Sequence, residues 1–344
     1  MSDKWPPFVA VSESVGTMRG TPRIQTRPRM NAVGRQFRVL MLDRLFGEGG
    51  TLMVLDRRSF LGSLAGGLVL SSRALAATRT LPEFAFHIVT DTHIGRQDGN
   101  TPLKQWKAAA SEINAAPGAF VLHLGDVVDS GREAQYPIYM DVRKTINKPV
   151  HEIPGNHDPQ DLFAKYIRPQ IDISFEHGGV RFVLFNNSDR ESHMGFIKPP
   201  QLEWLKSELA AAEKADQFVV LCCHVPVHTN THPDRGWYVK PADGQTEFYA
   251  LLEQHKGRVL GLFHGHFHNG IRGWEDHKPV IESLFPSCCY NQDRKLVNHP
   301  KLTGFVVDDL RVGYTNVTLG GGKMTLAYKP LGAESTARHE AAIS

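Results

Sequence analysis

The chain has 344 residues, of which 41% are hydrophobic and 22% are charged, proportions that are ordinary for a globular domain with a substantial core. Its formal net charge is +3, but the basic excess lies in the first 77 positions, so the remainder is slightly acidic. A slightly acidic body argues against a nucleic-acid partner bound through a broad basic face.

Residues 53–77 have the parts of an export signal in the right order. Arg57 and Arg58 precede an apolar stretch, and the segment closes on Ala-Leu-Ala, which is typical of a cleavage site. The string D-R-R-S-F-L-G resembles a twin-arginine signal, although Asp56 stands where Ser or Thr is common and Gly62 where Lys is common. The apolar stretch is too short for a comfortable membrane span. We predict a bacterial protein that the twin-arginine machinery exports to the periplasm or medium, with no stable membrane span when mature.

A signal peptide stands at the start of a protein, whereas this one begins at Met53. Residues 1–52 are rich in Arg, Gly and Pro and show no sustained hydrophobic period. We expect Met53 to be the true start, which would make residues 1–52 a misassigned or disordered extension.

The rest of the chain alternates β-rich runs with helical patterns, which predicts a single α/β domain over residues 82–332. The expected strands are residues 85–90, 120–124, 150–154, 180–186, 218–223, 259–263 and 279–284. Apolar residues at helical spacing occur around residues 103–113, 202–209 and 248–252. A final antiparallel meander is expected at residues 304–308, 314–319 and 324–328, followed by a flexible tail at residues 333–344.

Polar clusters follow five of these expected strands. In chain order they are D-T-H (Asp91, His93), G-D-V-V-D (Asp126), G-N-H-D (Asn156 to Asp158), a single histidine (His224) and H-G-H-F-H (His264 to His268). Functional side chains gather beyond the carboxyl ends of strands in open α/β sheets. Each cluster alone has an ordinary structural explanation, but their ordered combination behind successive strands predicts one shared site.

This order of motifs resembles the calcineurin-like metallophosphoesterases, and within them the branch that holds bacterial class III cyclic-nucleotide phosphodiesterases and glycerophosphodiesterases. The resemblance spans residues 84 to about 284 and includes all five motifs. It implies a four-layer α/β/β/α sandwich, a single catalytic domain with two metal ions. It also implies an enzyme that hydrolyses phosphodiesters or phosphomonoesters of small molecules through attack by a metal-bridging hydroxide.

The resemblance also assigns roles to individual residues. Asp91, His93 and His268 would hold one metal, Asn156, His224 and His266 the other, and Asp126 would bridge both. Imidazoles and carboxylates suit Fe, Mn, Zn or Co. His157 would stabilise the phosphoryl group or protonate the leaving oxygen, and Asp158 would orient His157. Asn156, His157 and Arg235 are the candidate substrate-binding residues.

Several points stay open at this level. Residues 229–243, with Arg235 and Trp237, and residues 187–200, with His193, are either substrate loops or ordinary exposed loops. His264 is expected to be a core residue or to support a ligand, and Asp129 to support a ligand or cap a turn. The four cysteines form two adjacent pairs, which are buried free thiols or a disulfide between the pairs. We favour free thiols, because twin-arginine export carries folded proteins.

Three other functions are weighed against the phosphodiesterase. A metallo-β-lactamase-type hydrolase would need H-x-H-x-D-H, but Asn269 follows the last histidine here and no aspartate stands at the required place. A purple acid phosphatase, a monoesterase, would carry tyrosine where Asp129 stands. A relative that binds metal or ligand without turnover would be expected to have lost ligands, and all of them are present.

Overall fold

The computed structural model describes residues 83–96, 100–229, 236–268, 272–274, 282–292, 310–335 and 337–343. The predicted export signal, the Met53 start and the extension before it lie outside these residues. So do the expected strand at residues 304–308 and the candidate substrate residue Arg235. Within the described ranges, no helix combines the length and the apolar composition that crossing a bilayer requires.

Two six-stranded sheets form the centre of the domain. In the first, β1 (Phe84–Val89), β2 (Val121–His123) and β3 (Val150–Glu152) are parallel, and β10 (Gly313–Gly320), β11 (Lys323–Pro330) and β12 (Ala337–Ala342) extend it antiparallel from β1. In the second, β5 (Val180–Leu184), β6 (Phe218–Cys222), β7 (Val259–His264) and β9 (Glu282–Leu284) are parallel, with antiparallel β4 (Ile173–His177) and β8 (Arg272–Trp274) at the edges.

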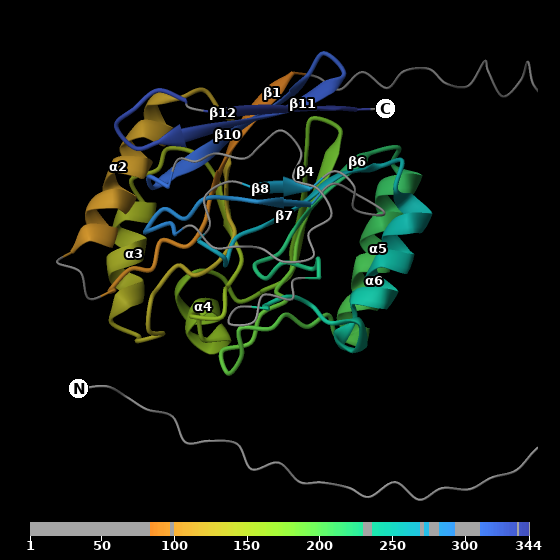
Figure 1. Cartoon of the computed structure of the whole chain (residues 1–344), viewed down its shortest axis with the longest axis horizontal. Helices are drawn as coiled ribbons and strands as arrows, with labels where there is room; N and C mark the ends of the chain where they lie inside the picture. The colour runs from red at the N-terminus through yellow and green to blue at the C-terminus, as the bar shows by residue number, and fades with distance from the viewer. Residues whose placement is uncertain are drawn as a thin grey trace, which may run out of the picture. The chain divides into compact units, whose positions relative to one another are not determined.

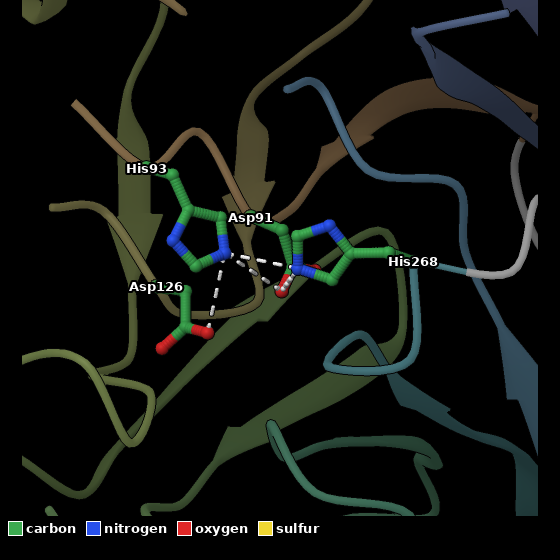
Figure 2. A group of neighbouring side chains, drawn as sticks. All are labelled: Asp91, His93, Asp126 and His268. Carbon is green, nitrogen blue, oxygen red and sulfur yellow. Dashed lines mark hydrogen bonds and ion pairs between the residues drawn. The ribbon is translucent and has the colours of Figure 1, made fainter. Parts of the chain in front are cut away.

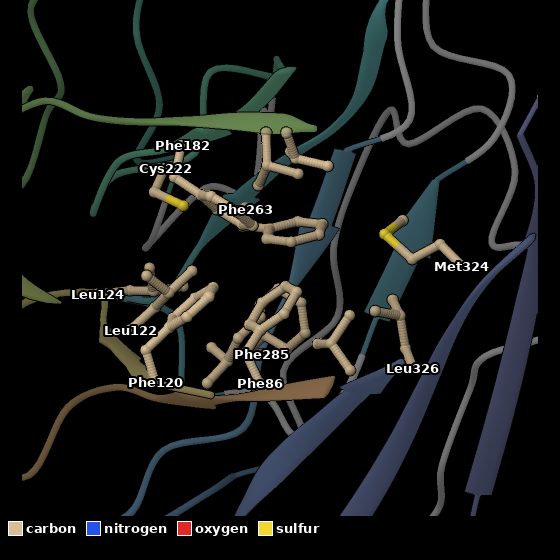
Figure 3. Packing of buried hydrophobic residues seen from close by; sticks show 14 of the residues in the cluster. Phe86, Phe120, Leu122, Leu124, Phe182, Cys222, Phe263, Phe285, Met324 and Leu326 are labelled. Atoms are coloured by element: carbon tan, nitrogen blue, oxygen red, sulfur yellow. The ribbon is translucent and has the colours of Figure 1, made fainter. Parts of the chain in front are cut away.

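The central strands are apolar on both faces because both faces are covered. Along β5, Phe182 and Leu184 belong to the core between the sheets, whereas the intervening Val183 packs beneath helices. Strand β1 alternates likewise, with Phe86 in the shared core (Figure 3) and Val89 on the helix side. This is the pattern expected of buried parallel strands, whose alternate side chains point to opposite faces.

Helices cover the outer face of each sheet (Figure 1). The first sheet packs against α2 (Thr101–Ala115), α3 (Gln135–Arg143) and α4 (Gln160–Tyr166), and the second against α5 (Pro199–Lys214) and α6 (Gln245–His255). The described layers are therefore helix, sheet, sheet and helix, and the predicted α/β/β/α sandwich is confirmed. A short 3₁₀ turn, η1 (Pro241–Asp243), precedes α6.

The helices form where the apolar spacing predicted three of them. Trp106, Ala110 and Ile113 are the buried face of α2, and a proline in the first turn suits a helix start, where its missing N–H has no intrahelical role. Leu205 and Leu209 bury the corresponding face of α5. All four cysteines are buried free thiols, as favoured from the sequence.

The structure differs from the sequence-based expectation at the C-terminal end. Residues 333–344 were expected to be a flexible tail, yet residues 337–342 form β12, which pairs antiparallel with β11 along six residue pairs. The expectation is wrong there because the edge of β11 offers unpaired N–H and C=O groups. A segment without an apolar pattern can still form hydrogen bonds with these groups. A glycine turn at Gly320–Gly322 joins β10 to β11, with positive φ at all three residues.

Gly265 gives a test of how tightly the ends of β1 and β7 approach each other across the two sheets. A Cβ there would lie 2.5 Å from Asp91 Oδ2 and closer still to Thr90 Oγ1. We expect Gly265→Ala to lower the unfolding free energy by about 1–3 kcal/mol, the usual cost of overpacking. Gly257→Ala is the control, since nothing lies within 4 Å of its added Cβ. Chemical denaturation of both variants would measure this, and equal stability would contradict the close approach.

Candidate metal centre

The predicted site residues lie on loops that leave parallel strands of both sheets. Asp91 and His93 follow β1, Asp126 follows β2, and the segment with Asn156 follows β3. From the second sheet, His224 follows β6, and His266 and His268 follow β7. Backbone hydrogen bonds join neighbouring loops: the N–H of His93 donates to the Asp126 carbonyl at 3.0 Å, and that of Gly265 to the His224 carbonyl at 3.1 Å.

Five of the seven predicted ligands have left-handed backbone conformations. Their φ values are 55° for Asp91, 44° for His93, 54° for Asp126, 75° for His266 and 49° for His268. Asp and His tolerate this region better than most residues, but it still costs free energy, of the order of 1–3 kcal/mol each. Such a concentration of strain at one place indicates a site whose geometry the surrounding fold imposes.

The first group of ligand atoms comprises Asp91, His93, Asp126 and His268, which Figure 2 shows pointing toward one another. Nε2 of His93 lies 2.9 Å from Nε2 of His268, 3.5 Å from Asp126 Oδ2 and 3.8 Å from Asp91 Oδ1. Nε2 of His268 lies 3.1 Å from Asp91 Oδ1. All four side chains are buried. These two carboxylates and two imidazoles can together hold one metal ion.

A second group shares Asp126 with the first. Nε2 of His224 lies 3.2 Å from Asp126 Oδ2 and 3.2 Å from Nδ1 of His266, and all three side chains are buried. Asn156 lies at the edge of this group. Its Oδ1 is buried and has no hydrogen-bond partner among the described residues, whereas its Nδ2 lies 3.2 Å from Nδ1 of His193. An unsatisfied buried oxygen is costly, and a cation would satisfy it.

The ring nitrogens that face away from the two groups have acceptors. Nδ1 of His224 donates to the Leu124 carbonyl at 2.7 Å, Nδ1 of His268 to the Tyr290 carbonyl at 2.9 Å, and Nε2 of His266 to the His193 carbonyl at 3.0 Å. Nδ1 of His93 lies 3.3 Å from Asp129 Oδ1. Outward N–H groups fix each imidazole so that its other nitrogen presents a lone pair inward, the arrangement that metal-binding histidines require.

The donor set therefore fits metal ions. With their outward nitrogens donating, His93 and His268 would present two lone pairs at each other across 2.9 Å, which is repulsive unless a cation or proton lies between them. Nitrogen and oxygen donors suit first-row divalent metals. Two sheets flanked by helices, with grouped Asp and His side chains at their strand ends, thus form an α/β domain whose site could hold metal ions.

In the absence of metal, protonated histidines supply positive charge beside the buried carboxylates of this centre. Burial disfavours the charged form of Asp91, yet the charges of His268 and His224 hold the pKa of Asp91 well below its usual value. Burial would lower the pKa of His93, but the carboxylates of Asp129, Asp91 and Asp126 around it raise the pKa of His93 well above its usual value. For His224 burial acts the same way, and the charge of Asp126 outweighs it and raises the pKa of His224 to about 9.

His157 lies at the rim, where the sequence placed a catalytic group. Its N–H donates to Asp126 Oδ1 at 2.9 Å, and its ring is half-buried, 4.7 Å from the His93 ring. The ring is held by a hydrogen bond from Nδ1 to the Asp129 carbonyl. A backbone carbonyl therefore orients His157 and leaves Nε2 for a bound substrate.

The role predicted for Asp158 is corrected. Its carboxylate is buried and accepts N–H groups from Val127 at 3.0 Å, Val128 at 3.1 Å and Gly155 at 2.9 Å, so it fastens the loop after β2 to the loop after β3. Burial, together with the charge of Asp126, raises the pKa of Asp158 to about 6. No hydrogen bond between Asp158 and the His157 ring is found among the described residues, because backbone donors take up the carboxylate.

Other supporting residues were not predicted. Asn187 holds His224 in place: its Oδ1 accepts the N–H groups of His224 at 3.1 Å and Val225 at 2.9 Å, and its Nδ2 donates to the Val225 carbonyl at 2.7 Å. Ser287 donates to the Asp91 carbonyl at 2.9 Å and anchors the loop that carries Tyr290. A signal for this loop was present, since the polar string S-C-C-Y-N follows an expected strand as the other clusters do.

His264 and Asp129 have the supporting roles that the sequence left open. His264 is fully buried and its Nε2 lies 3.2 Å from Glu282 Oε1. Glu282 also accepts the N–H groups of Val227 at 2.8 Å and His228 at 3.0 Å, and so ties β9 to the loop after His224. Asp129 contacts the first group through His93, and it forms a further cluster with His93 and His157 whose potential ligand atoms lie within 4.8 Å of one another.

A comparison with protein families identifies the class more closely. The family model described as "Calcineurin-like phosphoesterase" matches residues 84–270, more than half of the chain. The chain therefore belongs to the calcineurin-like phosphoesterase family, and it is a phosphoester hydrolase.

Curated relatives carry phosphodiesterase names. A probable cyclic nucleotide phosphodiesterase of Rhodococcus erythropolis is 27% identical over 227 residues, which cover 61% of this chain and 72% of that protein. The glycerophosphodiester phosphodiesterase GpdQ of Enterobacter lignolyticus is 26% identical over 201 residues, which cover 53% of this chain and 69% of that protein. The two relatives differ in the substrate class that their names state.

Solved structures share the fold. A dimetal phosphatase from Danio rerio superposes with a TM-score of 0.57 at 15% identity, covering 77% of this chain and 100% of that chain. A purple acid phosphatase from yellow lupin (Lupinus luteus) gives 0.60 at 15% identity, covering 76% of this chain, which spans about half (54%) of the lupin chain. At this identity the likeness is one of architecture.

Metal loading should displace protons, because an imidazolium cannot bind a cation. In the metal-free protein the pKa of His224 is raised to about 9 and that of His93 is raised well above its usual value, so filling both groups near neutral pH should release protons from these two rings. Apparent affinity should then rise with pH and level off only above about pH 9. Calorimetric titration of chelator-treated protein with Mn²⁺, in buffers of different ionisation enthalpy, measures the release. A binding heat independent of the buffer would contradict it.

Proposed function

We propose that the chain is an exported phosphodiesterase with two metal ions. The observation that carries the proposal is the pair of ligand groups that share Asp126. One comprises Asp91, His93, Asp126 and His268, and the other Asp126, His224 and His266 with Asn156 at its edge. The donor set suits Fe, Mn, Zn or Co. When bound, such ions supply Lewis acidity and a water of lowered pKa for attack on phosphorus.

The chain's own residues do the remaining work. Asn156 and His157 lie on the same loop after β3, so a phosphoryl group at the centre would have an amide and an imidazole within reach. His157 is half-buried at the rim and its Nδ1 is engaged with the Asp129 carbonyl, so its Nε2 can donate a proton to the leaving oxygen. Asp158 accepts N–H groups from this loop and from the loop after β2, and so keeps His157 next to Asp126.

Phosphodiesters are the favoured substrates. The two curated relatives described above carry names that state phosphodiester hydrolysis. The residue at the end of the second motif is Asp129, whose carboxylate lies against His93, and not the tyrosine expected of a purple acid phosphatase. A phosphomonoesterase is the alternative, and a metal-binding relative without turnover is the non-enzymatic one.

Two variants separate metal binding from proton transfer. His157→Ala should keep metal content near wild type while kcat for bis(p-nitrophenyl) phosphate falls by about 10²–10⁴-fold, the range for loss of a general acid. Asp126→Ala should lose both metal and activity, because it removes the ligand that both groups share. Elemental analysis and a colorimetric assay with added Mn²⁺ measure the two effects. Full activity in His157→Ala would refute the role of His157, and faster hydrolysis of p-nitrophenyl phosphate would favour the monoesterase.

Export is proposed from the paired arginines of residues 53–77 and their apolar stretch. Twin-arginine export carries folded proteins, which suits a metalloenzyme that loads its ions before crossing the membrane. We expect replacement of Arg57 and Arg58 by lysine to keep the protein in the cytoplasm of a bacterial host, whereas the unchanged chain reaches the periplasm. Cell fractionation with activity assay measures this, and unaltered periplasmic activity in the double variant would rule out the twin-arginine route.

A further inference from the structure

Two loops meet beside the second ligand group and form one wall of the centre. The N–H of Gly195 donates to the Tyr238 carbonyl at 3.3 Å, and Gly195 forms a parallel bridge with Val239. The N–H of Val239 in turn donates to the Pro226 carbonyl at 3.0 Å, close to His224 in the chain. The segment around His193 is therefore fastened to the segment around Trp237, and both are tied to the loop after β6.

His193 and Trp237 form a stacked pair within this wall. Their ring centroids are 4.2 Å apart with an interplanar angle of 21°. Trp237 packs against Phe267 and Leu284, and the centroid of its ring lies 5.1 Å from that of the His266 ring. The tryptophan is thus a half-buried support, while the imidazole of His193 is exposed.

This pair touches the ligand group itself. Nδ1 of His193 lies 3.2 Å from Nδ2 of Asn156, and the carbonyl of His193 accepts from Nε2 of His266 at 3.0 Å. The exposed ring therefore stands directly beside the place where a phosphoester would meet Asn156. A flat group attached to phosphorus would have a supported aromatic surface to lie on.

Among the residues that the structure describes, the other side of the centre offers no comparable surface. There Tyr290 lies 4.2 Å from the His268 ring, but the guanidinium of Arg96 covers it, 4.1 Å from the ring centroid. Arg96 is in turn 3.8 Å from Asp129 Oδ1. A substrate ring would have to displace this cation from Tyr290, whereas His193 is exposed to solvent.

We propose that the His193–Trp237 pair is a stacking platform that selects phosphodiesters carrying an aromatic ring, such as a nucleobase, over aliphatic esters such as those of glycerol. The proposal rests on the proposed function and names its substrate class. Stacking on an aromatic side chain is tolerant of ring type because every base has a π-face. Aromatic pairs contribute about three- to tenfold in affinity beyond area burial.

The experiment compares binding of adenosine 5′-monophosphate with that of glycerol 3-phosphate to the Mn²⁺-loaded full chain, by calorimetry. Both ligands carry the same phosphate group but differ in ribose as well as adenine, so the change of their Kd ratio between wild type and the His193 variants reports on stacking of the ring. Wild type should bind the nucleotide more tightly, and His193→Ala should reduce this preference about three- to tenfold. His193→Phe, which keeps a ring, should retain the preference, whereas His193→Gln, which keeps hydrogen bonding to Asn156 without a ring, should lose it.

Turnover and metal content separate the possible failures. No hydrolysis of 3′,5′-cyclic AMP or glycerophosphoethanolamine by wild type would refute the proposed function, while the binding ratio would still test the platform. Equal affinity of wild type for the two ligands, no measurable binding of either, or an unchanged ratio in His193→Ala would overturn the platform.

Elemental analysis of each variant checks that the metal remains, since loss of an ion would weaken the binding of both ligands together. Trp237→Leu should reduce the preference as His193→Ala does, because it removes the support of the imidazole, and an unchanged ratio there would also count against the platform.

Discussion

The Asp126 carboxylate is the interaction on which the rest of the centre depends. Only 1% of the residue is exposed, and its two oxygens meet three other loops: Oδ1 accepts the N–H of His157, while Oδ2 faces His224 and His93. Burying a carboxylate costs several kcal/mol unless nearby positive charge and hydrogen bonds offset it. Strand ends from both sheets must therefore converge on this one group, which couples assembly of the sandwich to assembly of the site.

Rigid packing makes the strained loops possible. Left-handed aspartates and histidines would relax if their flanking strands could move, but β1, β6 and β7 are packed on both faces by cores on either side. The free energy of that packing holds the ends of the loops in place. Within the loops, side chains such as Asn187 and Asp158 fix the backbone by accepting hydrogen bonds from its N–H groups. Site geometry is thus set by long-range contacts imposed on short polar loops.

This division explains what could be read from the sequence. Buried strands and the polar groups behind them are local patterns, so the α/β domain, three helices and a shared polar site were predictable from the residues, whereas the four-layer sandwich and the two ligand groups came from the resemblance to a family. The roles of Asn187 and Asp158 were not predictable, because each side chain hydrogen-bonds to backbone more than twenty-five residues away, and no local pattern marks such a contact. Helix α3 was missed because Pro137 interrupts its pattern, and β12 because strand pairing at a sheet edge needs no apolar alternation.

Strand β12 also affects how the molecule meets its neighbours in solution. Without it, the eight residues of β11 would present a row of unpaired amide and carbonyl groups, a template on which another chain could add a strand. With it, the outermost strand of this sheet is a six-residue segment that carries Arg338 and Glu340, and Glu340 pairs with Lys323 at 2.9 Å. Short, charged edges resist intermolecular pairing. Strand β12 therefore gives this sheet the kind of edge that is poorly suited to strand addition by another chain.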